Sequence, residues 1–247
     1  MPVARSGRSS PIARRYLTTY RREMSVAPLA LVGGEEWRGG CEVFDRRLLD
    51  LARTATVAVL PTAAAAEGKP EGSVAWARRY FTALGAEVKG VMVVDRDGAH
   101  DPAHCDAVRR ARFLYIAGGS PPFLYQALED SPLWQAVIES RRDGLVMAGS
   151  SAGAMVLGSS RLGAVAVDVL PHHERRRGTT GEGGPGRAPP EAEPAVERRA
   201  PKQNAPAVGI DARTALLWDG AAWSVSGVGD VTMYGLSSLD DLPAPAV

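Results

Sequence analysis

Hydrophobic positions between residues 29 and 148 come in short continuous runs, and longer amphipathic stretches separate these runs. Continuous apolar runs are typical of strands that are buried on both faces, and one-sided apolar stretches are typical of helices. In the first amphipathic stretch, Val43, Leu48, Leu49 and Leu51 fall on one side of a helix. We therefore expect strands at 29–32, 56–61, 88–94, 113–117 and 145–148, and helices at 41–53, 72–84, 102–112, 122–139 and 152–158.

This alternation of strands and helices predicts an α/β fold with a mainly parallel central sheet, covered on both faces by right-handed crossovers in a three-layer sandwich. After residue 164 the pattern changes. Two short apolar segments, 214–218 and 223–228, flank the turn residues Asp219 and Gly220. This arrangement predicts an antiparallel hairpin near the C-terminus, at the edge of the sheet.

The chain of 247 residues is expected to form a single α/β domain over residues 25–247. Residues 1–24 stand apart, because the first 23 residues hold six arginines and one acid and contain no sustained apolar stretch. We expect a disordered basic tail; a start at Met24 and a targeting segment are the alternatives. Residues 178–206 contain five glycines and six prolines and one bulky apolar residue, so we also expect a disordered insert there.

Charge and cysteine content exclude several function classes. The formal net charge is +1, which gives no reason to expect nucleic acid or an anionic membrane as a partner. No apolar run approaches the ~18 residues that a membrane helix needs. Cys41 and Cys105 are too few for a disulfide framework and have no metal-ligand spacing with histidine. A cytoplasmic location is the expectation.

The segment LVMAGSSAGAMVL, residues 145–157, reads as a strand that turns sharply into a helix. Gly149, Ser151 and Gly153 fit the G-x-S-x-G nucleophile elbow, in which small residues let a tight turn hold the serine hydroxyl clear of the backbone. Ser151 is therefore a candidate nucleophile. The N–H of Ala152 opens the following helix and is the first candidate donor to an oxyanion.

Small residues also follow the other strands, and ligands of such sheets bind beyond the carboxyl ends of the strands. Gly33, Gly34, Glu35 and Glu36 follow the first strand, and Gly118, Gly119 and Ser120 follow the fourth. The N–H of Gly119 is the second candidate oxyanion donor, and Gly118 and Ser120 are candidate substrate contacts, although a simple tight turn is the alternative. These turns carry no nucleotide-binding glycine pattern.

A serine nucleophile needs a base, and the four histidines are His100, His104, His172 and His173. The first two lie in a polar stretch, whereas the second pair follows an apolar run and should stand at a strand end, so one of that pair is the expected base. Asp168 precedes His172 by four residues on the same face of an extended strand and is the candidate acid. Glu174 is the alternative acid, and Asp168 could equally be a charged edge-strand residue.

The segments LVGGEEW, AVLPTAAA, LYIAGGSPP, AGSSAGAM, VLPHH and VGIDARTALL resemble, in this order, the S51 serine peptidases, the family of aspartyl dipeptidase and cyanophycinase. The resemblance covers about Leu29 to Tyr234. It implies a flavodoxin-like or class I glutamine-amidotransferase-like sandwich and a Ser-His-acid site that acts without metal or cofactor. Ser151 matches the serine of the family's SAGA element and His172 matches its histidine, whereas His173 replaces a phenylalanine that is common in the family.

The chain also departs from the family pattern. Only residues 152–171 separate Ser151 from His172, whereas the family usually carries a longer insertion that supplies the acid. Ala212 replaces the family's acid after GID, so Asp211 is left either to bind substrate or to form a turn. We expect a serine peptidase of the dipeptidase or exopeptidase type that cleaves small aspartyl-containing peptides. The alternative is a catalytically impaired relative that acts as a binding module. The expected partner is a small peptide, and the chain could also pair with a second copy of itself in a homodimer.

Overall fold

The structure is a computed structural model that describes residues 26–158, 162–174 and 206–246. The expected basic tail, residues 1–24, and the expected insert, residues 178–206 apart from Pro206, lie outside the described residues. Within the described ranges, no helix combines the length and the apolar character that crossing a membrane requires.

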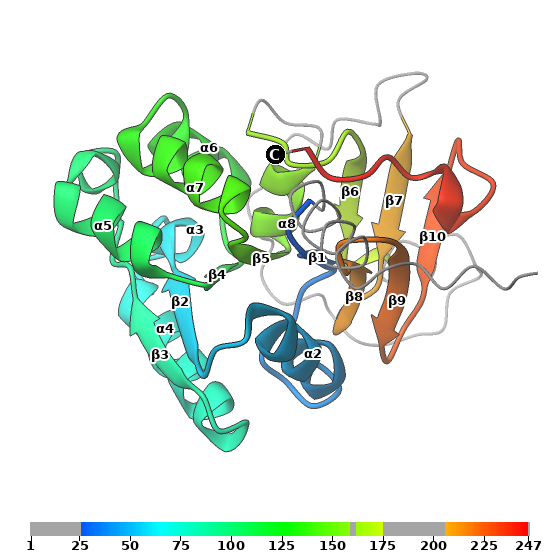
Figure 1. Cartoon of the computed structure of the whole chain (residues 1–247), viewed down its shortest axis with the longest axis horizontal. Helices are drawn as coiled ribbons and strands as arrows, with labels where there is room; N and C mark the ends of the chain where they lie inside the picture. Colours follow the sequence, from blue (N-terminus) through cyan, green and yellow to red (C-terminus); the bar gives the residue numbers. More distant parts are fainter. Residues whose placement is uncertain (1–25, 159–161, 175–205, 247) are drawn as a thin grey trace, which may run out of the picture.

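A seven-stranded sheet forms the centre of the molecule, in the order β3-β2-β4-β5-β1-β8-β9 (Figure 1). The first five strands of this order run parallel, and β8 and β9 run antiparallel to their neighbours. The expected mainly parallel sheet and the C-terminal hairpin at its edge are therefore both confirmed. The strands are β1 (Leu29–Val32), β2 (Thr56–Leu60), β3 (Glu87–Gly90), β4 (Phe113–Ile116), β5 (Val146–Ser150), β8 (Thr214–Trp218) and β9 (Trp223–Gly227).

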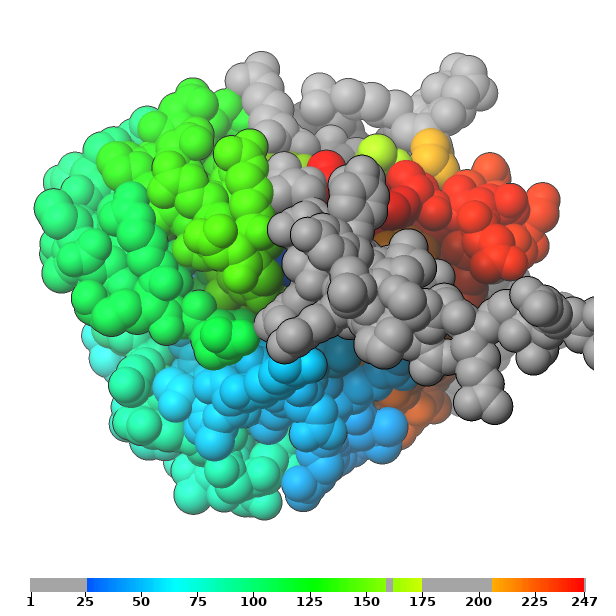
Figure 2. Space-filling view, viewed as in Figure 1, coloured from blue at the N-terminus to red at the C-terminus, as the bar shows by residue number. Residues whose placement is uncertain are grey.

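Each central strand is buried on both faces because its side chains alternate between two hydrophobic clusters. In β1, Leu29 and Leu31 join one cluster, and Ala30 and Val32 join the other. The first cluster includes α5 (Pro102–Arg110), α6 (Pro121–Leu128), α7 (Pro132–Arg142) and α8 (Ala152–Leu157); the second includes α2 (Glu42–Ala52) and α4 (Pro70–Ala83). Figure 2 shows the green atoms of the α5–α7 region above the blue and cyan atoms of the segments that contain α2 and α4.

A second, three-stranded sheet lies beside the first, in the order β10-β7-β6. Its strands β6 (Asp168–Pro171) and β7 (Ala207–Ile210) are parallel, and β10 (Val231–Tyr234) is antiparallel to β7. Val169, Val208 and Ile210 join the hydrophobic cluster that contains α8. The small sheet is therefore fixed against the helix that follows the elbow. Short helices complete the described elements: α3 (Thr62–Ala65) and the 3-10 turns Gly98–His100 and Leu239–Asp241.

The prediction of a single helix at 122–139 is wrong, because the structure has two helices, α6 and α7, in this region. The break lies at Asp130, whose φ of 54° is left-handed. Ser131 then caps the second helix by accepting a hydrogen bond from the N–H of Trp134 at 3.1 Å, and Pro132 takes the first helical position. The sequence Ser-Pro inside an apolar stretch therefore marked a new helix start.

Two further expectations need correction. The strand expected at 88–94 ends at Gly90, and Val91 and Val93 are buried without belonging to a strand. Val43 does not face the core, because its side chain is 68% exposed. In α2 the residues spaced by four, Phe44, Leu48 and Ala52, form the buried line instead.

Candidate active site

Ser151 occupies the sharp turn between β5 and α8, with φ 48° and ψ −107°. Its N–H donates to the carbonyl oxygen of Val32 on the neighbouring strand at 3.0 Å. The flanking glycines are needed for close packing: a Cβ on Gly149 would lie 2.6 Å from the carbonyl carbon of Gly153, and one on Gly153 would lie 2.5 Å from the carbonyl oxygen of Ile116. The strand-turn-helix context of a nucleophile elbow is present.

His172 directly follows β6 and faces the elbow. Its Nε2 lies 3.3 Å from Oγ of Ser151, which is within hydrogen-bond reach of a nucleophile for a general base. The N–H of His172 donates to the carbonyl oxygen of Gly33 at 2.7 Å. Gly34 lies against the imidazole so closely that a Cβ there would stand 2.1 Å from Cε1 of His172. The loop after β1 therefore supports the ring.

Among the residues it describes, the structure does not join Asp168, the candidate acid, to the imidazole of His172. Asp168 begins β6 and His172 follows the end of that strand, so four residue steps, about 13 Å of chain, lie between them. Nδ1 of His172 is buried and has no hydrogen-bond partner among the described residues. Residues on the same face of one strand are not neighbours in space unless they are two apart. Because β6 is an edge strand of the small sheet, Asp168 fits the alternative of a charged edge-strand residue.

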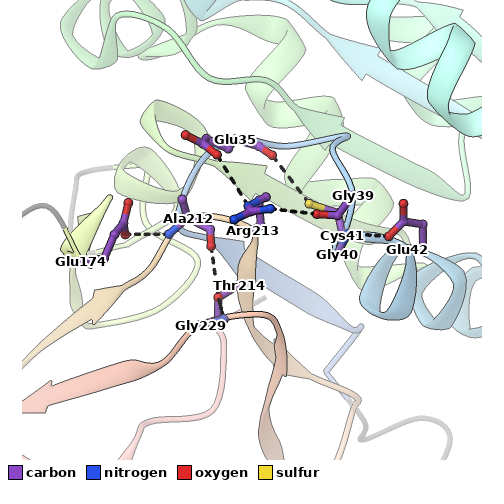
Figure 3. Close-up of polar contacts among 10 residues, drawn as sticks. All are labelled: Glu35, Gly39, Gly40, Cys41, Glu42, Glu174, Ala212, Arg213, Thr214 and Gly229. Carbon is purple, nitrogen blue, oxygen red and sulfur yellow. Dashed lines mark hydrogen bonds and ion pairs between the residues drawn. The ribbon is translucent and has the colours of Figure 1, made fainter.

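Glu174, the alternative acid, binds the turn between β7 and β8. Its Oε2 accepts a hydrogen bond from the N–H of Ala212 at 2.9 Å (Figure 3). This carboxylate therefore binds the backbone of Ala212 itself, the position at which this chain lacks an acidic side chain. Glu174 therefore links the catalytic segment to the turn, and no hydrogen bond joins it to His172 in the described part of the chain.

His173 and Asp211 are buried and lie just beyond the ends of β6 and β7 in the small sheet. Nε2 of His173 lies 2.7 Å from the hydroxyl oxygen of Tyr234, and Nδ1 lies 3.9 Å from Oδ1 of Asp211. The other carboxylate oxygen of Asp211 accepts a hydrogen bond from the N–H of Asp230 at 3.0 Å. Asp211 therefore anchors the segment before β10, in line with its turn-forming alternative, and a substrate contact of Asp211 stays a prediction.

The two candidate oxyanion donors come from the start of α8 and from the loop after β4. The N–H groups of Ala152 and Gly119 have no hydrogen-bond acceptor among the described residues. Gly119 has a φ of 139°, and a Cβ there would stand 2.3 Å from the carbonyl oxygen of Ala63, so only glycine fits. Gly118 is not a free donor, and Ser120 caps α6, with its Oγ 3.5 Å from the N of Phe123.

Glu36 is a site residue to which the sequence pattern gave no role. Its Oε1 accepts a hydrogen bond from the N–H of Gly118 at 2.8 Å, and its Oε2 accepts one from the hydroxyl of Ser150 at 2.7 Å. It thus joins the loop after β1 to the ends of β4 and β5. Its place directly after Gly33 and Gly34, at a strand end, was the available signal.

Arg213 lies on the turn that leads into β8. Its N–H donates to the carbonyl oxygen of Gly34 at 2.8 Å, and its Nη1 donates to the carbonyl oxygen of Gly39 at 3.3 Å (Figure 3). Its Nε lies 3.6 Å from Oε2 of Glu35, and 42% of the Arg213 side chain is exposed. A guanidinium therefore lies on the loop that supports the imidazole.

Residues with a left-handed backbone conformation are concentrated around this site. Seven non-glycine residues of the described ranges have positive φ, and five of them lie in the elbow or in the segments next to it: Glu35, Trp37, Ser151, His172 and Arg213. Each such residue costs of the order of 1–3 kcal/mol and persists where the surrounding structure holds it. This clustering is typical of a functional site.

The nearby Cys41 is not a competing nucleophile. Its thiol is buried and lies 3.7 Å from the carbonyl oxygen of Glu35. Burial raises the pKa of this thiol to about 12. At neutral pH the sulfur therefore stays protonated, whereas nucleophilic chemistry requires a thiolate.

The chain is similar to known peptidases in sequence and in fold. The model of peptidase family S51 matches residues 29–169. A crystal structure of a peptidase from an acI-B1 actinobacterium is similar, with 27% identity and a TM-score of 0.73 over 88% of this chain and 94% of that one. A putative peptidase E protein from Listeria monocytogenes EGD-e shares the fold, with 16% identity and a TM-score of 0.52 over 85% of this chain and 99% of that one. No curated protein sequence matches the chain.

Proposed function

This chain belongs to peptidase family S51, and from that premise we propose that it is a serine-type peptidase that hydrolyses small aspartyl-containing peptides. The observation that carries the proposal is the 3.3 Å approach of His172 Nε2 to Ser151 Oγ in a strained elbow. The free N–H groups of Ala152 and Gly119 support it, because acyl transfer needs donors where negative charge develops.

In the proposed reaction these groups act in sequence. Nε2 of His172 takes the hydroxyl proton as Oγ of Ser151 attacks the peptide carbonyl carbon, and the carbonyl oxygen becomes an oxyanion between Ala152 and Gly119. The carbon–nitrogen bond then breaks, and the imidazolium gives its proton to the leaving amine. Water next attacks the acyl-enzyme, gives a proton to His172 and releases the acid, and Ser151 regains its proton.

An aspartyl substrate brings a side-chain carboxylate, which requires a cationic partner in the site. We assign this role to Arg213, because its backbone is hydrogen-bonded to Gly34, the residue that lies against the imidazole. Its guanidinium already faces one carboxylate, that of Glu35, at 3.6 Å and remains partly exposed. A planar guanidinium can accept a second carboxylate or exchange partners.

A binding module without turnover is the second candidate function. The observation that favours it is the buried Nδ1 of His172, which has no hydrogen-bond partner among the described residues. An imidazole without an acid is less well oriented and its charged form is less stabilised during attack. In this case the chain would bind small peptides and release them intact.

A hydrolysis panel separates the two functions. Purified wild-type protein and the Ser151→Ala variant are assayed against Asp-X dipeptides, β-aspartyl-arginine and Ala-X dipeptides. Ser73→Ala on α4, away from the elbow, serves as the matched serine control. We expect hydrolysis of aspartyl peptides by wild type and by Ser73→Ala and none by Ser151→Ala. Binding of the same peptides by calorimetry without any wild-type hydrolysis would favour the binding module.

A further inference from the structure

The carboxylate of Glu36 lies directly beside the candidate nucleophile. A Cβ placed on Gly118 would stand 3.0 Å from Oε1 of Glu36 and 3.3 Å from Cβ of Ser151. The carboxylate and the nucleophilic serine therefore flank the same glycine, and a side chain on Gly118 would make a tight contact with both. Gly118 also precedes Gly119, whose N–H is the second candidate oxyanion donor.

Glu36 has no cationic partner within the described ranges. Both of its hydrogen bonds come from neutral groups, the N–H of Gly118 and the hydroxyl of Ser150. The adjacent Glu35, by contrast, faces the guanidinium of Arg213. A partly buried carboxylate without a counter-charge is costly, and here it also stands next to the place where a second negative charge must develop.

A cationic group of the substrate would remove both penalties. In a peptide with a free amino terminus, the ammonium nitrogen and the first carbonyl carbon are both bonded to one Cα, so they are only about 2.5 Å apart. A group that binds the ammonium must therefore lie close to the nucleophile that attacks this carbonyl. Glu36 meets this condition, because its carboxylate and Ser151 border the same residue.

We propose that Glu36 binds the α-ammonium of the substrate and restricts the enzyme to the bond that follows a free amino-terminal residue. This inference rests on the proposed serine peptidase function. The ammonium takes the free lone pairs of the carboxylate and neutralises its charge before the oxyanion forms. A peptide with a blocked amino terminus leaves the charge of Glu36 uncompensated and reacts slowly.

A purely positioning role for Glu36 is the competing explanation, since its two hydrogen bonds join the ends of three strands. The Glu36→Gln variant separates the two roles. A glutamine of the same shape keeps an acceptor for the N–H of Gly118 and a donor for the hydroxyl oxygen of Ser150, but it removes the charge. Glu35→Gln makes the same chemical change one residue earlier and is the matched control.

The test uses Asp-Leu, N-acetyl-Asp-Leu and an uncharged fluorophosphonate that reacts with activated serine. We expect wild type to prefer the free-amine peptide, and Glu36→Gln to lower kcat/KM for that peptide about 10- to 100-fold, mainly through KM, because an ionic hydrogen bond is lost. Labelling of Ser151 by the uncharged probe should rise in Glu36→Gln, because a negative charge beside the developing oxyanion is removed. Glu35→Gln should keep the preference for the free amine.

Three results would overturn the assignment. A parallel fall of hydrolysis and labelling in Glu36→Gln would show that Glu36 only positions the elbow. Equal wild-type turnover of the free and acetylated peptides would show that no ammonium is recognised. A wild-type protein that neither hydrolyses the peptides nor reacts with the probe would refute the proposed function itself, and the ammonium site with it.

Discussion

Gly34 offers a sharp test of the catalytic geometry, because it sets the position of the His172 ring without taking part in any chemical step. Gly34 has a φ of 114°, and a Cβ added there would lie 2.1 Å from Cε1 and 2.4 Å from Nε2 of His172. The methyl group of Gly34→Ala and the imidazole cannot occupy these positions together. Either the ring leaves Ser151 or the loop after β1 moves.

The expected magnitude follows from this overlap. Restoring an ordinary van der Waals contact requires the ring to shift by about 1 Å or more, and a displacement of that size costs of the order of 10²-fold in rate. The left-handed backbone adds a strain of about 1–2 kcal/mol. For a chain of this size, such a strain lowers Tm by roughly 2–8 °C. The activity should therefore fall far more than the stability.

The assay compares kcat/KM for an aspartyl dipeptide with Tm for wild type, Gly34→Ala and Gly39→Ala. Gly39 is the matched control, because it lies on the same loop and a Cβ there meets nothing within 4 Å. We expect Gly34→Ala to lose about 10²-fold or more in kcat/KM. Retention of more than about a third of wild-type kcat/KM by a folded Gly34→Ala would refute the account of how the imidazole is held.

Three further predictions concern charged residues. Asp168→Asn should leave kcat/KM within about 3-fold of wild type, since Asp168 does not reach His172; a loss of the order of 10³- to 10⁴-fold would restore it as the triad acid. Burial raises the pKa of the Asp45 carboxyl well above 3.8, although the hydrogen bond from Tyr80 opposes this effect. The folded state therefore binds a proton that the unfolded state loses above about pH 4, so the free energy of unfolding falls as the pH rises. The Tm of Asp45→Asn relative to wild type should therefore increase between pH 4 and 7, and a pH-independent difference would contradict this reasoning. Arg213→Met should raise KM for Asp-X peptides about 10-fold more than for Ala-X peptides, and an equal rise for both would remove Arg213 from carboxylate recognition.

The central sheet could be predicted from the sequence because its strands are continuous apolar runs that are buried on both faces. The apolar runs at β1, β2, β4 and β5 indicate buried strands, and the residues Asp219 and Gly220 indicate the turn of the hairpin. The small sheet could not be predicted in the same way. Its three strands have four residues each, and they pair across long separations in the chain, so local periodicity carries little information about them.

The residues of the candidate site also fall into those that the sequence could predict and those that it could not. Ser151 and the first candidate donor, Ala152, lie in one local motif whose turn geometry follows from the spacing of glycines, so the sequence identifies them. Glu36 and Gly34 act through contacts with residues far away in the chain, such as Ser150 and His172, and no local pattern encodes such contacts. Asp168 is a different case, because strand periodicity gives it a shared face with His172, but the same strand geometry places residues four apart about 13 Å from each other along the strand.

The central claim is that His172 activates Ser151 as a nucleophile. The most direct measurement is the rate and the site of reaction with an uncharged fluorophosphonate, followed by intact mass and peptide mapping of wild type and His172→Ala. The account predicts one adduct per wild-type chain, located on Ser151, and a labelling rate that is at least about 10²-fold lower in folded His172→Ala. An adduct on another residue, no adduct on wild type, or equal rates for the two proteins would contradict it.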